Sequence, residues 1–242
     1  MRRLALVVAT LLALAFPVAT AAVTGITVFA ASSLTQVLPK IDPGPRYSFG
    51  GSDALALQIR NGAPADVFAS ASPVQAKTLY REELVLRPQV FATNRLTVIV
   101  PSGNPARIRS VFDLRRRGLK IVIGDAQVPI GAYTRTVLAR LGVAKAVLKN
   151  VVSLENDAKG VLTKVVLRQA DAGFVYATDA RAASKRVATV QIPPRAQPNV
   201  EYSIAVVADS GNRGAAQAFV RRVLSATGRT QLRRAGFGVP AQ

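Results

Sequence analysis

The sequence predicts an α/β protein of two lobes with a ligand cleft between them. Short apolar runs alternate with segments whose apolar residues recur at helical spacing, and this alternation is typical of parallel sheets covered by helices. Two long strand-like runs lie beside prolines, LTVIVPSGNP at 96–105 and IPPRAQPNVEYSIAVVA at 192–208. If the chain passes out along one and back along the other, two crossing strands join the lobes, and small ligands bind in such clefts.

The predicted elements alternate along most of the chain. Runs rich in Val, Ile, Phe and Ala predict strands at residues 25–31, 66–71, 95–101, 119–124, 171–177, 187–192 and 201–208. Apolar residues three and four positions apart predict helices at residues 53–62, 72–83, 131–142, 157–170 and 212–228. We therefore assign residues 22–99 and 202–242 to lobe I and residues 100–201 to lobe II, with boundaries at the proline-flanked runs.

The first 21 residues have the features of a secretory signal peptide. Arg2 and Arg3 precede the apolar run LALVVATLLALAF, which is short for a membrane span, and Ala19-Thr20-Ala21 is a small-x-small cleavage site. We expect export to the periplasm and cleavage near residue 21. The chain has no cysteine, which excludes disulfides, thiolate metal sites and a lipid-modified cysteine.

The composition argues against two classes of function. The chain has 32 Lys and Arg against 13 Asp and Glu, but its basic residues are scattered and its aromatic residues do not interleave with them, so nucleic-acid binding is not expected. It has no histidine, which removes the usual general base, the usual metal ligand and the Ser-His-Asp triad. We expect neither a cofactor nor enzyme activity. Gly50-Gly51-Ser52-Asp53-Ala54 is close to a nucleophile elbow, so an exported hydrolase that uses Ser52 remains an alternative.

Four segments combine a strand end or loop with a helix start and are rich in small residues and hydroxyls. They are FAASSLTQ at 29–36, YSFGGSDALALQI at 47–59, IGDAQVPIGAYTR at 123–135 and SLENDAKGVL at 153–162. Helix N-termini carry partial positive charge and free N–H groups, so several of them around one cleft form an anion site without a formal cation. Each segment alone is an ordinary helix cap. Together they favour an anion site.

The motifs ITVFAASSLT, SFGGSDALALQIRNGAPADVFASA, IGDAQVPIGAYTRTVLARLG and GFVYATDA resemble those of the periplasmic molybdate-binding proteins of ABC transporters. The resemblance runs from about residue 25 to GFGVP at 236–240 and implies the type II periplasmic-binding-protein fold. That fold has two Rossmann-like lobes with mixed five-stranded sheets, joined by two crossing strands. The implied function is capture of molybdate, and of tungstate with it, and delivery to an ABC permease by a monomeric protein.

The resemblance also implies the site, when its motifs are matched residue by residue. The oxyanion would be held by the hydroxyls of Ser33, Ser52 and Tyr176 and by the backbone N–H groups of Ile130 and Ala158. Molybdate and tungstate are fully deprotonated dianions near neutral pH, so a site of donors alone suits them, whereas hydrogen phosphate needs an acceptor. Asp53 departs from the family pattern. We expect it to turn outward and cap a helix; otherwise sulfate, phosphate or another tetrahedral oxyanion is the alternative ligand.

Overall fold

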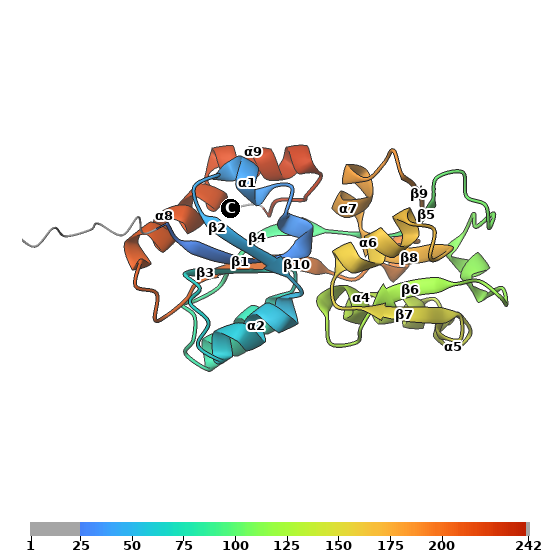
Figure 1. The fold of residues 1–242 in the computed structure, drawn as a ribbon, viewed down its shortest axis with the longest axis horizontal. Coiled ribbons are helices and arrows are strands. Elements are labelled where there is room, and N and C mark those ends of the chain that lie inside the picture. Colours follow the sequence, from blue (N-terminus) through green and yellow to red (C-terminus); the bar gives the residue numbers. More distant parts are fainter. Residues whose placement is uncertain (1–24, 241–242) are drawn as a thin grey trace, which may run out of the picture.

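The computed structural model describes residues 25–240 and shows two lobes, each built around its own five-stranded sheet (Figure 1). The strand order is β2-β1-β3-β10-β4 in the first sheet and β7-β6-β8-β5-β9 in the second. Both sheets mix parallel and antiparallel pairs, so the predicted fold class is confirmed. The predicted signal peptide at residues 1–21 lies outside the described residues.

The first sheet carries the N-terminal strands and one strand that returns late in the chain. Its strands are β1 (Thr27–Ala31), β2 (Arg46–Gly50), β3 (Val67–Ser70), β4 (Gln89–Asn94) and β10 (Val200–Val206). β1 pairs in parallel with β2 and β3, whereas β10 runs antiparallel to β3 and β4. Around this sheet lie η1 (Ser32–Leu34), α1 (Leu38–Ile41), α2 (Ser52–Arg60), α3 (Pro73–Arg81), α8 (Arg213–Leu224) and α9 (Ala226–Ala235).

The second sheet belongs to the middle of the chain. Its strands are β5 (Leu96–Pro101), β6 (Ile121–Gly124), β7 (Val151–Glu155), β8 (Ala172–Tyr176) and β9 (Val187–Val190). The helices of this lobe are η2 (Val111–Arg115), α4 (Pro129–Arg140), α5 (Ala144–Leu148), α6 (Ala158–Val166) and α7 (Ala177–Ala182), and η3 (Pro194–Ala196) follows β9. β3, β5, β6 and β8 are buried along their whole length, as expected for strands covered on both faces.

Two segments cross between the lobes. Arg95 separates β4 of the first sheet from β5 of the second, and residues 191–199 lead from β9 back to β10. The Gln197 side chain ties the two crossings together, because it accepts a hydrogen bond from the Leu96 N–H at 3.0 Å and donates one to the Leu96 carbonyl at 2.8 Å. The division of the chain into lobes remains a prediction. At the level of the sheets, all of β5 pairs within the second sheet, and the passage falls at Arg95.

The prediction of one helix over residues 212–228 is wrong. Ser225 ends α8 and begins α9, and its side chain accepts a hydrogen bond from the Gly228 N–H at 3.2 Å. The second helix packs tightly on the first at this point, because a Cβ on Gly228 would lie 2.4 Å from the Arg222 carbonyl oxygen. The apolar spacing continues across the break, so periodicity alone does not reveal it.

Candidate functional site

A small cavity lies between the two lobes, where β1 and β2 of the first sheet and β8 of the second end. Its volume is about 10 Å³, roughly the space of one water molecule, so the lobes are closed around it. The lining residues come from both lobes: Ala31, Ser32, Ser33, Gly50, Gly51, Ser52, Ala71, Val128, Pro129, Ile130, Asp157 and Tyr176. Four of the five predicted site residues are among them.

Ser33 reaches the cavity from the turn that follows β1. β1 is a buried strand, and the chain leaves it through the short helix η1, which begins at Ser32. Both serines are 6% exposed. The Ser33 Oγ lies 2.9 Å from the hydroxyl oxygen of Tyr202, a residue of β10. The Tyr202 side chain therefore holds the Ser33 side chain in place.

Ser52 is the first residue of α2 and is held by the backbone instead. Its Oγ accepts a hydrogen bond from the Ala71 N–H at 3.0 Å, and the residue is 1% exposed. Because this bond uses a lone pair of the oxygen, the hydroxyl proton of Ser52 stays available to donate into the cavity. Gly51 before it allows the other lobe to approach, since a Cβ there would lie 2.4 Å from the Asn156 carbonyl oxygen.

Tyr176 is the main polar group that lobe II brings to the cavity. It ends β8, caps α7 and is 2% exposed. Within residues 25–240, its hydroxyl has no hydrogen-bond partner. Burial, followed by the nearby Tyr202 hydroxyl, raises the pKa of Tyr176 well above its usual value of 10.0. The hydroxyl therefore stays protonated, and a ligand in the cavity would supply the acceptor that it lacks.

Two helix N-termini of lobe II also meet the cavity. α4 begins with Pro129, and the Ala132 N–H is bonded to the Val128 carbonyl, so the N–H of Ile130 belongs to the first turn, which has no acceptor within the helix. Ile130 lines the cavity as predicted. Ala158 begins α6 and is buried, but Asp157 lines the cavity in its place.

Asp157 caps α6, and its carboxylate accepts a hydrogen bond from the Gly160 N–H at 2.8 Å. This bond directs the carboxylate to its own helix. Asp157 precedes the first helical residue of the segment SLENDAKGVL, and an acidic residue in that position is the sequence signal of a helix cap.

Asp53 does not turn outward, and Gly51 rather than Asp53 occupies the N-cap position of α2. Asp53 lies in the first turn of this helix and does not line the cavity. Its Oδ1 atom is buried and has no partner within the described chain. Burial first, and then the carboxylates of Asp125 and Asp157 in lobe II, raise the pKa of Asp53. The side chain thus faces the other lobe beside the cavity.

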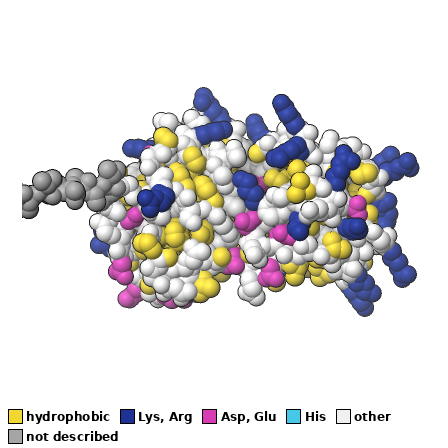
Figure 2. Space-filling model, viewed as in Figure 1, with side chains coloured by type: hydrophobic (Ala, Val, Ile, Leu, Met, Phe, Trp, Pro, Cys, Tyr) yellow, Lys and Arg dark blue, Asp and Glu magenta, His cyan; other side chains and the backbone are white. Residues whose placement is uncertain are grey.

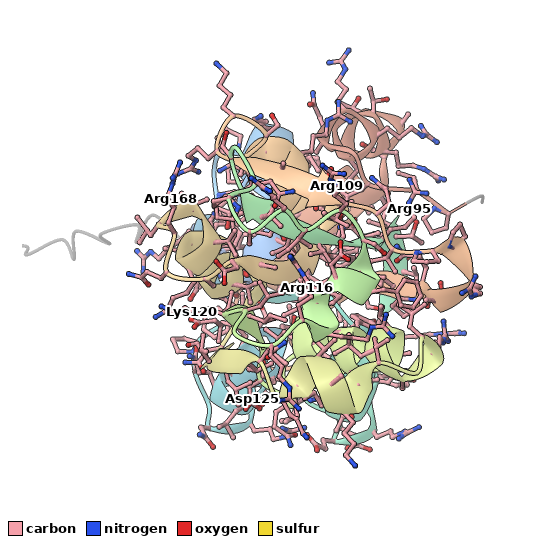
Figure 3. The ribbon with its side chains drawn as sticks, turned by 90° about the vertical axis from the view of Figure 1, so that its right-hand side faces the viewer. Arg95, Arg109, Arg116, Lys120, Asp125 and Arg168 are labelled. Carbon is pink, nitrogen blue, oxygen red and sulfur yellow. The ribbon has the colours of Figure 1, made fainter. Side chains whose placement is uncertain are left out.

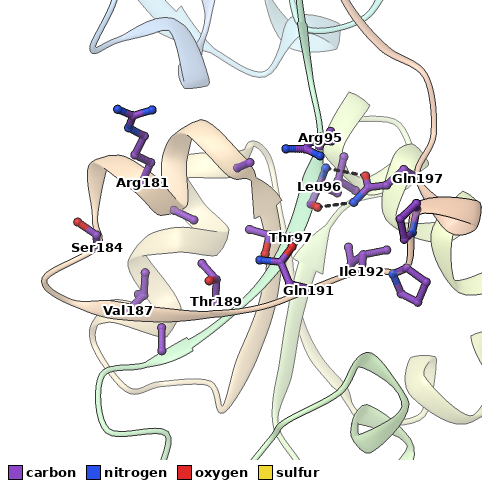
Figure 4. A pocket seen from close by; sticks show the side chains of 15 residues that line it. Arg95, Leu96, Thr97, Arg181, Ser184, Val187, Thr189, Gln191, Ile192 and Gln197 are labelled. Carbon is purple, nitrogen blue, oxygen red and sulfur yellow. Dashed lines mark hydrogen bonds between the residues drawn. The ribbon is translucent and has the colours of Figure 1, made fainter. Parts of the chain in front are cut away.

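A much larger hollow, of about 1110 Å³, lies against the crossing segments of lobe II (Figure 4). Its rim includes Arg95 and Arg181, both exposed, together with Gln191 and Gln197. It has no lining residue in common with the small cavity among the residues described. An open groove of this size leaves a small ion in contact with water, whereas desolvation of a dianion requires several donors at once. By the donors that both lobes bring to it, the small cavity matches the predicted ligand better than the groove does.

Basic side chains concentrate in lobe II. Residues 95–199 contain 18 of the 32 Lys and Arg of the chain but only 6 of its 13 Asp and Glu. Figure 2 shows dark blue side chains gathered at the end of this lobe, and Figure 3, viewed from that end, shows Arg109, Arg116, Lys120 and Arg168 around it. Within residues 25–240 there is no group of three His, Cys, Asp or Glu residues that could hold a metal ion. No helix in the same range is long and apolar enough to cross a membrane.

The fold and the cavity define a class: two-lobed α/β proteins that hold a small ligand between their lobes. A family model described as bacterial extracellular solute-binding protein matches residues 45–238. The chain belongs to this family, and it is a solute-binding protein rather than an enzyme.

Relatives with known ligands confirm the resemblance seen in the motifs. The molybdate-binding protein ModA of Mycobacterium tuberculosis is 39% identical over 225 residues, which cover 89% of this chain and 85% of that protein. ModA of Escherichia coli is 31% identical over 206 residues and covers 77% and 79% of the two chains. The structure of the periplasmic molybdate-binding protein of Azotobacter vinelandii has the same fold, with a TM-score of 0.79 over 89% of this chain and all of that one, at 21% identity.

Proposed function

We propose that this protein captures molybdate, and tungstate with it, in the interlobe cavity and delivers the oxyanion to an ABC permease. The observation that carries the proposal is the buried Tyr176 hydroxyl, which lines the cavity and has no partner within residues 25–240. A buried hydroxyl without a partner costs about 1 to 3 kcal/mol, and an oxyanion in the cavity would satisfy it. Relatives that are molybdate-binding proteins support the choice of ligand.

The proposed donors come from both lobes. Lobe I supplies the hydroxyls of Ser33 and Ser52, and lobe II supplies the Tyr176 hydroxyl and the N–H groups at the starts of α4 and α6, including those of Ile130 and Ala158. Hydrogen bonds to a charged acceptor are stronger than neutral ones, and the dianion gives up its water only when several form together. Closure of the lobes around the ion provides them simultaneously.

The charge of lobe II supports the uptake of an anion. An excess of basic side chains raises the local concentration of anions and their rate of association, and salt weakens both effects. We also propose that residues 1–21 are a cleaved signal peptide and that the mature protein works in the periplasm as a monomer, without nucleic acid. Its membership of an extracellular solute-binding family supports a location outside the cytoplasm.

Sulfate and phosphate are the alternative ligands, because two carboxylates lie close to the site. Asp157 lines the cavity and Asp53 lies beside it. The Asp157 carboxylate already accepts the Gly160 N–H, and Asp53 does not line the cavity. This arrangement favours the unprotonated dianions molybdate and tungstate over hydrogen phosphate.

Isothermal titration calorimetry tests the proposal. The mature chain, residues 22–242, is unfolded, dialysed free of ligand, refolded and titrated with molybdate, tungstate, sulfate and phosphate near neutral pH. We expect one-to-one binding of molybdate and tungstate and no heat from sulfate or phosphate. Binding of phosphate that strengthens at lower pH, without binding of molybdate, would contradict the proposal.

A further inference from the structure

Tyr202 lies directly behind Ser33 and is isolated from solvent. It belongs to β10, which follows the second crossing segment, and is fully buried. Three aromatic rings surround its own: Phe91 at 6.1 Å, Tyr176 at 5.7 Å and Phe237 at 5.4 Å between ring centroids, each in an edge-on arrangement. Such packing leaves the ring little freedom, so the position of the Tyr202 hydroxyl is fixed.

The hydrogen bonds of Asn94 indicate which group is the donor between Asn94 and Tyr202. The Arg95 N–H donates to the Asn94 Oδ1 at 2.9 Å, which identifies the oxygen of this amide. The NH₂ group therefore points the other way, and it donates to the Thr178 Oγ1 at 2.9 Å and to the Tyr202 hydroxyl oxygen at 3.4 Å. Asn94 ends β4 and Thr178 belongs to α7, so this amide also links the two lobes.

The series of hydrogen bonds continues from Tyr202 through Ser33 to the cavity. Because the Tyr202 oxygen accepts from Asn94, we assign Tyr202 as the donor to the Ser33 Oγ, which lies 2.9 Å from it. Ser33 in turn has a single proton, which is left to point into the cavity that Ser33 lines. Burial raises the pKa of Tyr202 well above its usual value, so the hydroxyl stays protonated and can donate a hydrogen bond.

We propose that Tyr202 is a positioning residue for the oxyanion: with Asn94 behind it, Tyr202 makes Ser33 a donor toward the ligand. This inference rests on the proposed function. Without the Tyr202 hydroxyl, the Ser33 hydroxyl is free to rotate, and its oxygen becomes available to accept a hydrogen bond from the O–H group of an oxyanion such as hydrogen phosphate. Tyr202 thus contributes both to affinity for a dianion and to rejection of a protonated one.

A double-mutant cycle on Ser33 and Tyr202 tests this, with molybdate affinity measured by calorimetry. We expect Tyr202→Phe to weaken binding about tenfold, the effect of one hydrogen bond to a charged group. In the Ser33→Ala background the same substitution should change the affinity less than about twofold, because Tyr202 acts through Ser33. Tyr202→Phe should also reduce the ratio of molybdate to phosphate affinity.

Tyr47→Phe is the matched control. Tyr47 is a lobe I tyrosine whose hydroxyl donates to the carbonyls of Leu38 and Asp42, away from the cavity, so its loss should leave molybdate affinity unchanged. Asn94→Ala is a second variant, which removes the group that sets the direction of donation. It should weaken binding about threefold and, like Tyr202→Phe, have little effect once Ser33 is Ala. Thermal melts check that every variant folds.

The outcomes separate this inference from the proposed function. If the wild-type protein does not bind molybdate, the proposed function is wrong. If the wild-type protein binds but Tyr202→Phe binds equally well, or if Tyr202→Phe and Ser33→Ala weaken binding additively, Tyr202 does not act through Ser33. A purely structural role of Tyr202 would lower the melting temperature and would not produce the non-additive cycle.

Discussion

The two lobes present different kinds of groups to the same cavity. On lobe I, both serine hydroxyls already have partners: Ser52 accepts the Ala71 N–H, and Ser33 pairs with Tyr202. On lobe II, the Tyr176 hydroxyl is buried without a partner within residues 25–240, and the Ile130 N–H lies in the first turn of a helix. The two serine oxygens of lobe I therefore already have partners in the closed protein without a ligand, whereas the Tyr176 hydroxyl of lobe II does not.

This difference indicates which part of the protein gains most from the ligand. Donors that are already held in place lose little freedom when they bind, so lobe I is preorganised. Donors without partners cost free energy in the closed, empty state, and an oxyanion removes that cost. We infer that the ligand stabilises closure mainly through lobe II. Each of the following experiments tests this contrast.

Gly51→Ala is expected to have the largest effect, because the added Cβ would push the two lobes apart beside the cavity. A Cβ at this position would lie 2.4 Å from the Asn156 carbonyl oxygen of lobe II and 2.8 Å from the Asp53 Oδ1. The backbone of Gly51, with φ −63° and ψ 135°, is allowed for alanine, so lobe I should fold normally. We expect a loss of molybdate affinity on the order of a hundredfold, measured by calorimetry, because misplaced donors from lobe II are lost together.

Gly214→Ala is the control for this substitution. Gly214 lies in α8 and does not line the cavity, and a Cβ there would meet no atom within 4 Å. It should bind molybdate as the wild-type protein does. Equal affinities for the two glycine variants would mean that contact between the lobes at Gly51 is not needed for binding.

Ser33→Ala and Ser52→Ala should weaken molybdate binding to a similar degree. They should differ in how far they lower the melting temperature. Ser52→Ala and Ser33→Ala each remove one donor, at a cost on the order of 1 to 3 kcal/mol of binding free energy. Ser52→Ala also leaves the buried Ala71 N–H without its acceptor, which should lower the melting temperature of the empty protein by several degrees. Ser33→Ala leaves only the Tyr202 hydroxyl short of an acceptor, so its melting temperature should fall less. The opposite order in thermal melts would show that the two serines are not held as described.

Unlike the serine substitutions, Tyr176→Phe should not lower the stability of the empty protein, because the hydroxyl that it removes has no partner in the described chain. The substitution removes a buried hydroxyl that has no partner in the described chain and keeps the ring that packs on Tyr202. We expect molybdate affinity to fall about tenfold while the empty protein melts at the same temperature as the wild type or slightly above it. A melting temperature well below that of the wild type would show that the hydroxyl has a partner in the empty protein.

The contrast between the lobes was only partly predictable from the sequence. Alternating patterns predicted both sheets, and matched motifs placed Ser33, Ser52, Ile130 and Tyr176, all of which line the cavity. Tyr202 was predicted only as part of a strand, because its role depends on a contact with Ser33, 169 residues away, that no local pattern encodes.

Some local elements were missed for a similar reason. The strands β4 and β7 lie at sheet edges, and the exposed Val152 of β7 shows that an edge strand lacks the continuous burial that the apolar runs were chosen to detect. The break at Ser225 depends on packing between α8 and α9, which periodicity does not report.

Asp179 of lobe II makes stability depend on pH, and this is the smallest of the expected effects. It lies in the first turn of α7, which Tyr176 caps, and its Oδ2 is buried without a partner in the described range. Burial raises its pKa from 3.8 to about 7, opposed by Lys159 and assisted by Asp157. Between about pH 4 and pH 7 the folded chain keeps this proton while the unfolded chain releases it. The stability contributed by the protonated form is therefore present below pH 4 and is lost as the pH rises through 7.

Asp179→Asn should remove this loss, because the amide does not ionise. We expect the melting temperature of the variant, relative to the wild type at the same pH, to rise by a few degrees between pH 4 and pH 8, which corresponds to about 1 kcal/mol or more. Differences from the wild type cancel the titration of other carboxylates, such as Asp113, whose pKa is lowered by backbone N–H groups. Parallel curves of melting temperature against pH would mean that the pKa of Asp179 is the same in the folded and the unfolded chain. Diverging curves would show that lobe II carries a buried carboxyl group with a raised pKa in addition to the unpartnered hydroxyl of Tyr176.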